Sequence, residues 1–150
     1  MVHKFFEDVQ VGDKTITGTK KITREEIIDF ANLYDPQPMH LSDEGGKNSL
    51  FGELVASGWH TFTLTMRLVV DAKPLGETPL IGMKVQDVHL IKPLKPDDEI
   101  YAVSEIVSKK ESSSKPHVGY ASVKTITYTT DDQPIAEQVW VILIPKRPQE

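Results

Sequence analysis

The sequence predicts an α+β domain in which a curved antiparallel sheet packs on one face against a long helix. Two observations lead to this prediction. A helical segment and a long apolar segment over 58–72 occupy the first half of the chain, and four stretches of strand-like alternation follow between residues 81 and 144. Consecutive strands joined by short loops are most simply antiparallel, so these stretches are expected to form one sheet over the apolar segment.

Length and composition restrict the class of protein. The chain has 150 residues, 17 Lys and Arg, 22 Asp and Glu, a net charge of −5 and no cysteine. A chain of this length is expected to form one domain, here residues 1–150. The acidic balance disfavours nucleic-acid binding, the apolar runs are too short to predict a membrane-spanning helix, and the first residues do not have the pattern of a secretory signal. The absence of cysteine excludes disulfides and thiolate metal sites, which fits a cytoplasmic protein.

The N-terminal elements begin with a short edge strand expected at Thr15–Thr19. Thr23 and Glu26 then have the spacing of a capping box, in which the Thr23 hydroxyl accepts from the Glu26 amide and Glu26 reaches back. Apolar residues at helical spacing follow, and Pro36 disfavours helical backbone at the residue before it. This pattern predicts a helix over about 24–34.

A long connector over 35–57 separates this helix from the apolar segment. A short helix is expected near Asp43–Lys47, although Gly45 and Gly46 weaken that prediction. A connector of this length is uncommon in a compact domain unless it carries a site. We therefore expect functional residues within it.

The apolar segment after Ser57 has two interpretations. Phe62 and Leu64 alternate with threonines as in a half-buried strand, but the segment continues to Lys73–Pro74 and is long for a strand. If it is a helix, Ser57 is its N-cap. Such a helix is apolar on several sides and is therefore expected to be central and largely buried. Periodicity alone leaves both interpretations open.

Four strands are expected in the second half of the chain, at Ile81–Leu90, Glu99–Lys109, Val118–Thr130 and Ile135–Ile144. Segments rich in turn-forming residues separate the later strands. The last of the four strands is expected to close the sheet.

The densest set of reactive groups is Asp35-Pro-Gln-Pro-Met-His40. Two prolines lie between the carboxylate and the imidazole and stiffen the backbone that must hold a catalytic pair in place. Such a pair can bind a water and move protons near neutral pH. The alternative is a simple turn with His40 as an ordinary surface histidine. Spacing alone favours this alternative by roughly two to one.

A second candidate site lies at Ser57-Gly58-Trp59. A glycine at a helix start leaves its amide open to an oxygen atom, and the helix dipole favours negative charge there, which is one way to build an oxyanion hole. The alternative is an N-cap followed by a tight helix entry, and both tryptophans are more simply explained as core residues. The remaining histidines show no metal-ligand spacing, so neither a metal nor a cofactor is expected.

Two stretches together resemble the MaoC-like dehydratase family, which includes the (R)-specific enoyl-CoA hydratases: Asp35–His40 and Phe51–Thr61. The opening Phe6–Asp13 and the loop Lys92–Asp98 also resemble that family, so the resemblance covers nearly the whole chain. The family's hydratase signature reads Asp-x-Asn-Pro-x-His. Gln37 stands where the signature has Asn.

This resemblance implies a hotdog fold, in which a curved antiparallel sheet wraps a long central helix. It therefore selects the helix for the apolar segment. It also implies a homodimer or higher homo-oligomer with sites near the subunit interface, and an acyl-CoA or acyl-carrier thioester as substrate. The implied reaction is the reversible hydration of a 2-enoyl thioester. Two alternatives keep the fold without this reaction, namely a noncatalytic acyl-thioester binding module and a hotdog thioesterase.

The resemblance also implies roles for single residues. Asp35 is expected to shuttle the proton while His40 orients the water, and the Gly58 N–H is expected to donate to the thioester oxygen. Gln37, one methylene longer than Asn, is expected to shape the loop. The residues implied around the substrate are Gly58, Ser57, Gln37 and Trp59.

Overall fold

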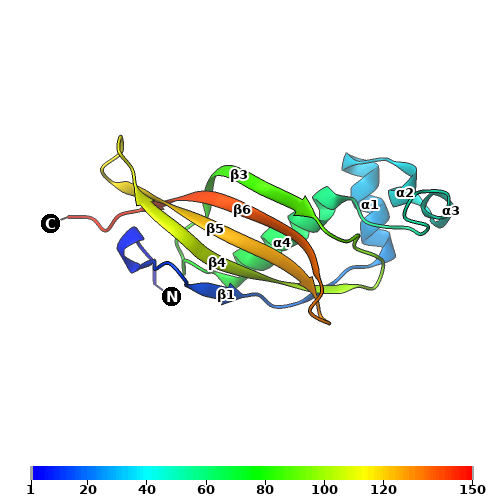
Figure 1. Cartoon of the computed structure of the whole chain (residues 1–150), viewed down its shortest axis with the longest axis horizontal. Coiled ribbons are helices and arrows are strands. Elements are labelled where there is room, and N and C mark those ends of the chain that lie inside the picture. Colours follow the sequence, from blue (N-terminus) through cyan, green and yellow to red (C-terminus); the bar gives the residue numbers. More distant parts are fainter. Residues whose placement is uncertain (1, 150) are drawn as a thin grey trace.

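The computed structural model describes residues 2–149 (Figure 1). Its elements in chain order are the 3₁₀ helix η1 (Phe6–Asp8), β1 (Lys14–Ile16), β2 (Lys20–Lys21), α1 (Arg24–Tyr34), α2 (Pro38–Leu41), α3 (Asp43–Lys47), α4 (Gly58–Ala72), β3 (Ile81–Leu90), β4 (Glu99–Glu111), β5 (Val118–Thr129) and β6 (Pro134–Pro145). The predicted α+β class is confirmed, as are the two main helices and the four long strands. None of the helices in the described chain combines the length and the apolar character that crossing a membrane requires.

Within residues 2–149, six strands form one antiparallel sheet in the order β1-β4-β5-β6-β3, with β2 also pairing with β4. The expectation that the last strand closes the sheet is wrong, because β6 lies inside it and β3 lies at its edge. The chain leaves β3 and crosses the end of the sheet to enter β4 (Figure 1). In that crossing, the amides of Ile91 and Lys92 donate to the Ile135 carbonyl at 2.8 and 3.1 Å. These bonds hold the start of the crossing against β6.

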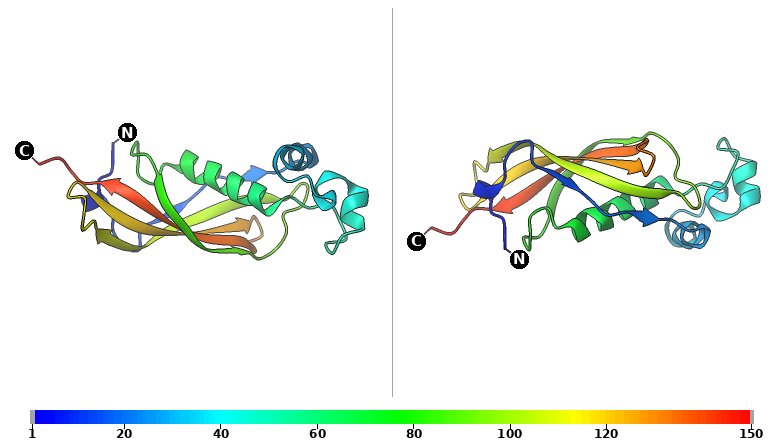
Figure 2. Two further views of the ribbon diagram at one scale, coloured as in Figure 1. Left: turned by 90° about the horizontal axis from the view of Figure 1, so that it is seen from above. Right: turned by 90° about the horizontal axis from the view of Figure 1, so that it is seen from below.

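Helix α4 lies along one face of the curved sheet (Figure 2). Thr65, Leu68 and Val69 are buried, whereas Trp59 and Met66 are 70% and 41% exposed. The helix was therefore predicted correctly, but the expectation that it is largely buried is wrong for this single chain. The reason is geometric, because the sheet covers only one side of the helix and leaves the opposite side open.

The first strand and the first helix differ in detail from the sequence prediction. The expected strand over residues 15–19 is interrupted at Thr17, whose hydroxyl accepts from the Ala102 amide at 2.8 Å in place of a backbone carbonyl. At α1, the Thr23 hydroxyl accepts from the Glu26 amide at 3.2 Å, as predicted. The Glu26 carboxylate returns to the Thr23 hydroxyl and also accepts from Lys20.

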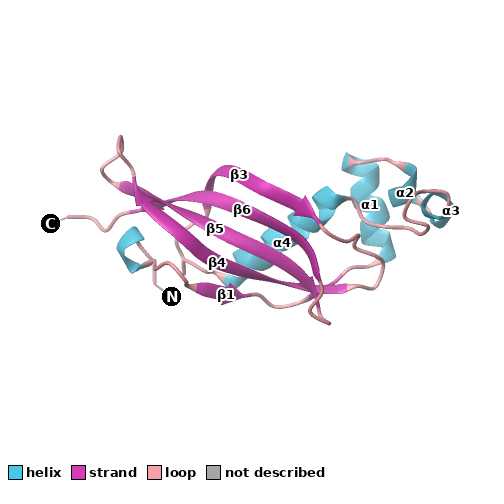
Figure 3. Cartoon of the chain, in the orientation of Figure 1, coloured by secondary structure: helices cyan, strands magenta, loops and turns pink. Residues whose placement is uncertain are grey.

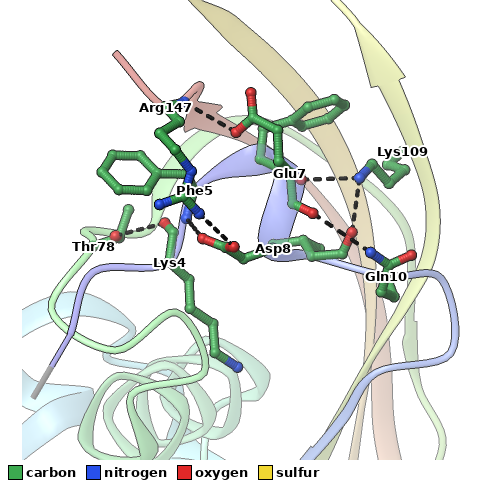
Figure 4. A network of polar contacts seen from close by, with 10 residues as sticks. Lys4, Phe5, Glu7, Asp8, Gln10, Thr78, Lys109 and Arg147 are labelled. Atoms are coloured by element: carbon green, nitrogen blue, oxygen red, sulfur yellow. Dashed lines mark hydrogen bonds and ion pairs between the residues drawn. The ribbon is translucent and has the colours of Figure 1, made fainter. Parts of the chain in front are cut away.

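The N-terminal segment packs at the end of the sheet that lies far from α1 (Figure 1), and Figure 4 shows its polar contacts. The Lys109 ammonium donates to the carbonyls of Phe6 and Val9 at 2.9 and 2.8 Å. The Phe6 ring occupies the space that a Cβ atom at position 119 would need, so Gly119 permits this packing. At the other terminus, the Arg147 guanidinium pairs with the Asp8 carboxylate. These contacts connect both chain ends to the sheet.

Candidate active site

Helices α1, α2 and α3 gather at one end of the sheet, next to the first turn of α4 (Figure 3). The short helix expected at Asp43–Lys47 is confirmed as α3. Its two glycines, which weakened the prediction, are explained by close packing. A Cβ atom at Gly45 would collide with the Pro38 carbonyl, and one at Gly46 with the backbone of Glu53 and Leu54. Helix α2 was not predicted, and Pro38 stands at its first position, where its missing N–H costs nothing.

The Asp35 carboxylate is held by donors on both of its oxygens. The Ser57 hydroxyl donates to Oδ2 and the Gln37 amide donates to Oδ1, each at 2.7 Å. These bonds favour the ionised form, so they lower the pKa of Asp35, the Ser57 bond most and the Gln37 bond next. The charge of nearby His40 acts in the same direction, whereas partial burial opposes it. We therefore expect Asp35 to be an anion at neutral pH.

Ser57 does not cap α4 with its side chain, contrary to the expected N-cap interaction. It stands at the N-cap position, but among the described residues its hydroxyl accepts from no amide of the helix. The hydroxyl turns instead toward Asp35, and Ser57 is 0% exposed. The side chain is oriented by its donation to the carboxylate, because hydrogen bonds to ionised groups are stronger than the neutral bond that a helix amide would give.

His40 is buried, at 5% exposure, so it is not the surface histidine of the turn interpretation. Its Nδ1 lies 2.7 Å from the Val55 carbonyl oxygen. Because a carbonyl only accepts, this contact assigns the hydrogen of a neutral ring to Nδ1. The other ring atom, Nε2, lies 3.4 Å from Oδ2 of Asp35. A neutral His40 thus turns a proton-accepting atom toward the carboxylate.

A cavity of about 560 Å³ opens beside this pair. Asp35, Gln37 and His40 contribute polar groups to its lining. The apolar walls include Met39, Phe51, Trp59, Phe62, Val88 and Leu90. A mostly apolar pocket of this size with a few convergent polar groups is typical of a small-molecule site. The arrangement can bind an apolar chain while it presents a carboxylate and an imidazole to one reacting group.

The predicted site residues thus converge, but in different ways. Asp35, Gln37, His40 and Ser57 form one connected polar group, with Ser57 behind the carboxylate rather than in the cavity wall. Gly58 and Trp59 line the cavity. The Gly58 N–H belongs to the first turn of α4, where helix amides have no intrahelical acceptor.

Sequence reasoning missed two contributions to this site. The Val55 carbonyl sets the tautomer of His40, but a backbone acceptor has no signature in a residue pattern. Val88 and Leu90 reach the cavity from β3, which is adjacent only through the tertiary fold. The sequence shows the alternation of Val88 and Leu90 within the β3 segment, but it does not show which other element these two side chains face.

The neighbouring His60 does not join the polar group. Its ring stacks on Phe30 of α1, with centroids 4.4 Å apart, and it is 5% exposed. Burial lowers the pKa of His60, while the charges of Glu26 and Lys20 act in opposite directions. Across residues 2–149, no three histidine or carboxylate side chains converge as a metal site would require.

A curved antiparallel sheet over one central helix, with an Asp–His pair at the start of that helix, defines a hotdog-fold domain of the hydratase and dehydratase type. Residues 8–129 match the family model for the MaoC like domain. The chain belongs to this family.

Individual proteins are similar to this chain over most of its length. The MaoC-like dehydratase from Rhodospirillum rubrum has a solved structure that superposes with a TM-score of 0.91 at 32% identity, covering 97% of this chain and 99% of that one. The Bacillus subtilis protein YdeM is 26% identical over 92% of this chain and 96% of its own length. The R-hydratase PhaJ1 from Pseudomonas aeruginosa shares the fold, with a TM-score of 0.73 at 19% identity over 97% of this chain and 88% of that one.

Proposed function

We propose that this protein catalyses the reversible hydration of a 2-enoyl thioester, with Asp35 and His40 holding and activating one water. The observation that carries the proposal is the 3.4 Å approach of His40 Nε2 to Asp35 Oδ2 at the wall of an apolar cavity. Both atoms accept hydrogen bonds when His40 is neutral. Since hydrogen bonds to water span about 2.8 Å, one water can donate to both atoms at once.

The reaction needs three groups, and the site has a candidate for each. A water oxygen must bond to C3 while a proton reaches C2, and negative charge builds on the thioester oxygen. Asp35 and His40 supply the hydrogen-bond acceptors that hold and activate the water. The Gly58 N–H at the positive end of α4 is the proposed donor to the thioester oxygen, as in an oxyanion hole. The apolar walls of the cavity accommodate the acyl chain.

The proposed substrate is an acyl-CoA or acyl-carrier thioester. The family membership and the R-hydratase-like fold support a thioester substrate, and the cavity size suits a small acyl group. The rim includes Lys92, whose ammonium can meet an anionic carrier arm.

The proposed assembly is a homodimer that pairs through β3. In the described chain, β3 pairs only with β6, so its other edge is free. Ile81, Met83 and Val85 on this strand are at least half exposed, at 50%, 51% and 57%. An exposed apolar edge strand of this kind favours pairing with another chain. Trp59 lines the cavity and is 70% exposed, so a partner at this face would cover part of the site.

The noncatalytic binding module is the second candidate function. The same cavity supports acyl-thioester binding without turnover. The buried imidazole beside an ionised carboxylate favours the enzyme, because desolvating such groups is costly and a binding module gains nothing from them. The thioesterase alternative would direct the same water at the thioester carbonyl, and the Asp-x-x-Pro-x-His spacing of residues 35–40 favours hydration over it.

The deciding experiment follows the ultraviolet absorbance of crotonyl-CoA and of longer enoyl-CoA thioesters after the protein is added. Hydration removes the conjugated double bond and lowers the absorbance. Calorimetric titration with a saturated acyl-CoA of the same length measures binding in parallel. Turnover supports the enzyme, whereas tight binding without turnover on any enoyl thioester would favour the binding module.

A further inference from the structure

We propose that Ser57 and Gln37 are positioning residues that clamp the Asp35 carboxylate, so that Asp35 stays ionised through the reaction and Nε2 of His40 carries the mobile proton. This inference deepens the proposed hydration and rests on it for its catalytic consequence. The clamp itself rests on two contacts of 2.7 Å, one to each carboxylate oxygen.

The lone pairs of Asp35 are partly occupied by donors. An ionised carboxylate offers about four acceptor positions on its two oxygens. Gln37 uses one on Oδ1 and Ser57 uses one on Oδ2, and the imidazole of His40 lies against Oδ2. Protonation of either oxygen would weaken the hydrogen bond that this oxygen accepts, so both contacts favour the ionised carboxylate.

The two clamping bonds differ in how costly they are to break. Ser57 is fully buried, so its hydroxyl has no bulk water to turn to when Asp35 is protonated. A buried polar group that loses its partner is costly. The Gln37 side chain is exposed, and its bond alone would be the easier one to exchange for water. Ser57 is therefore the stronger of the two clamping residues.

The mobile proton belongs to His40 in this proposal. Nε2 of His40 is the unprotonated ring atom in the neutral tautomer, since Nδ1 donates to Val55. In hydration, an O–H bond of the water breaks and its proton bonds to Nε2. The water oxygen bonds to C3, and the π pair of the C2–C3 double bond moves toward the thioester oxygen as an enolate. The proton on Nε2 then passes to C2, the enolate pair forms the C2–H bond, and the imidazole returns to its neutral form.

Gln37 gains a specific role from this scheme. The signature of the family has Asn at this position, which is one methylene shorter. In this chain the longer side chain reaches Oδ1 of Asp35. The expected role of Gln37 in shaping the loop is thereby extended to a direct contact with the reacting pair.

The test is a carboxyl carbon-13 NMR titration of the full-length protein, with Asp35→Asn identifying the Asp35 signal. The clamp predicts that Asp35 titrates below its ordinary range in the wild type. The midpoint should move up in Ser57→Ala and, by a smaller amount, in Gln37→Ala. Ser49→Ala is the matched control, because its hydroxyl donates to the Gly46 carbonyl and does not touch Asp35. An unchanged midpoint in Ser57→Ala would overturn the clamp.

Kinetics give the second readout. A hydrogen bond to a charged group contributes more free energy than a neutral one. Its loss in Ser57→Ala should therefore lower kcat by about 10- to 100-fold while KM changes little. If Ser57→Ala fails to fold, Ser57→Cys keeps the volume with a much weaker donor and is titrated in its place.

The two proposals fail separately. A clamp confirmed by titration in a protein without turnover would remove the hydration proposal and leave the carboxylate contacts intact. Turnover with an unshifted Asp35 midpoint in Ser57→Ala would keep hydration and remove the clamp.

Discussion

The Ser57 hydroxyl donates to Asp35 Oδ2 at 2.7 Å, across 22 residues of sequence. Asp35 is the C-cap residue of α1 and Ser57 is the N-cap residue of α4, so this bond joins the end of one helix to the start of another. It orients the carboxylate toward the imidazole of His40. The contact therefore connects the packing of α1 against α4 with the geometry of the candidate catalytic pair.

Removal of either member of the pair tests the chemistry directly. Asp35→Asn keeps the shape of the side chain but removes its charge, and His40→Ala removes the second acceptor of the water. Each change should lower kcat for a short enoyl-CoA by roughly 10²–10⁴. The double variant should lose much less than the product of the two, because groups that act as a unit are not additive.

The stability of Asp35→Asn and His40→Ala must be measured together with their rates. Melting temperatures should separate lost chemistry from lost structure, because His40 is buried and Asp35 bridges two helices. Full activity in both single variants would move the chemistry to other residues.

The stability of the protein should fall on mild acidification through His60. Because burial lowers the pKa of His60 in the folded state, the unfolded chain binds this proton more readily. The stability that neutral, buried His60 contributes is fully present above the ordinary histidine pKa of about 6.5. It is lost as the pH falls toward the lower pKa that His60 has in the folded state. His60→Phe keeps an aromatic ring against Phe30 and should flatten the decrease in melting temperature between about pH 7.5 and 5. Substitution of the exposed His117 by Gln is the control, and an equal effect there would contradict this origin.

The glycines of α3 should be required for folding of the connector. In Gly46→Ala, the new methyl group meets the backbone of Glu53 and Leu54, which cannot move as a flexible side chain would. We expect a loss of about 1–3 kcal/mol in the free energy of unfolding, together with reduced activity. The control is Gly18→Ala, because a Cβ atom at position 18 meets nothing within 4 Å. Chemical denaturation measures both, and equal stability of the two variants would contradict the packing role.

Charge on β3 should break the proposed dimer. Val85→Lys places an ammonium on the free edge of β3, where desolvating it on pairing is unfavourable. We expect light scattering at micromolar concentration to show a dimer for the wild type and a monomer for this variant. Ile16→Lys is the matched control, since Ile16 is 71% exposed on the opposite edge strand β1. A wild-type monomer, or dissociation by Ile16→Lys, would contradict pairing through β3.

The sequence alone was sufficient for the features that depend on neighbours in the chain. The spacing of Thr23, Glu26 and Pro36 placed both ends of α1, because capping and the restriction before proline are local effects. Alternation located the four long strands, since the side-chain period of a strand is also local. The Asp35–His40 spacing within a stiff connector gave a candidate site, although spacing alone favoured a simple turn and the family resemblance was needed to prefer the site. For α4, periodicity was ambiguous, and the family resemblance decided in favour of the helix.

Only the tertiary structure decided the features that depend on residues far apart in the chain. The Ser57 hydroxyl could accept from a helix amide or donate to a carboxylate, and the carboxylate of Asp35 was brought within reach only by the packing of α1 against α4. The tautomer of His40 follows from the Val55 carbonyl, 15 residues away. The position of β3 beyond β6 follows from long-range pairing, which no local period encodes. Propensity and period act over a few residues, whereas orientation, tautomer and strand order are set by contacts that exist only after the chain has folded.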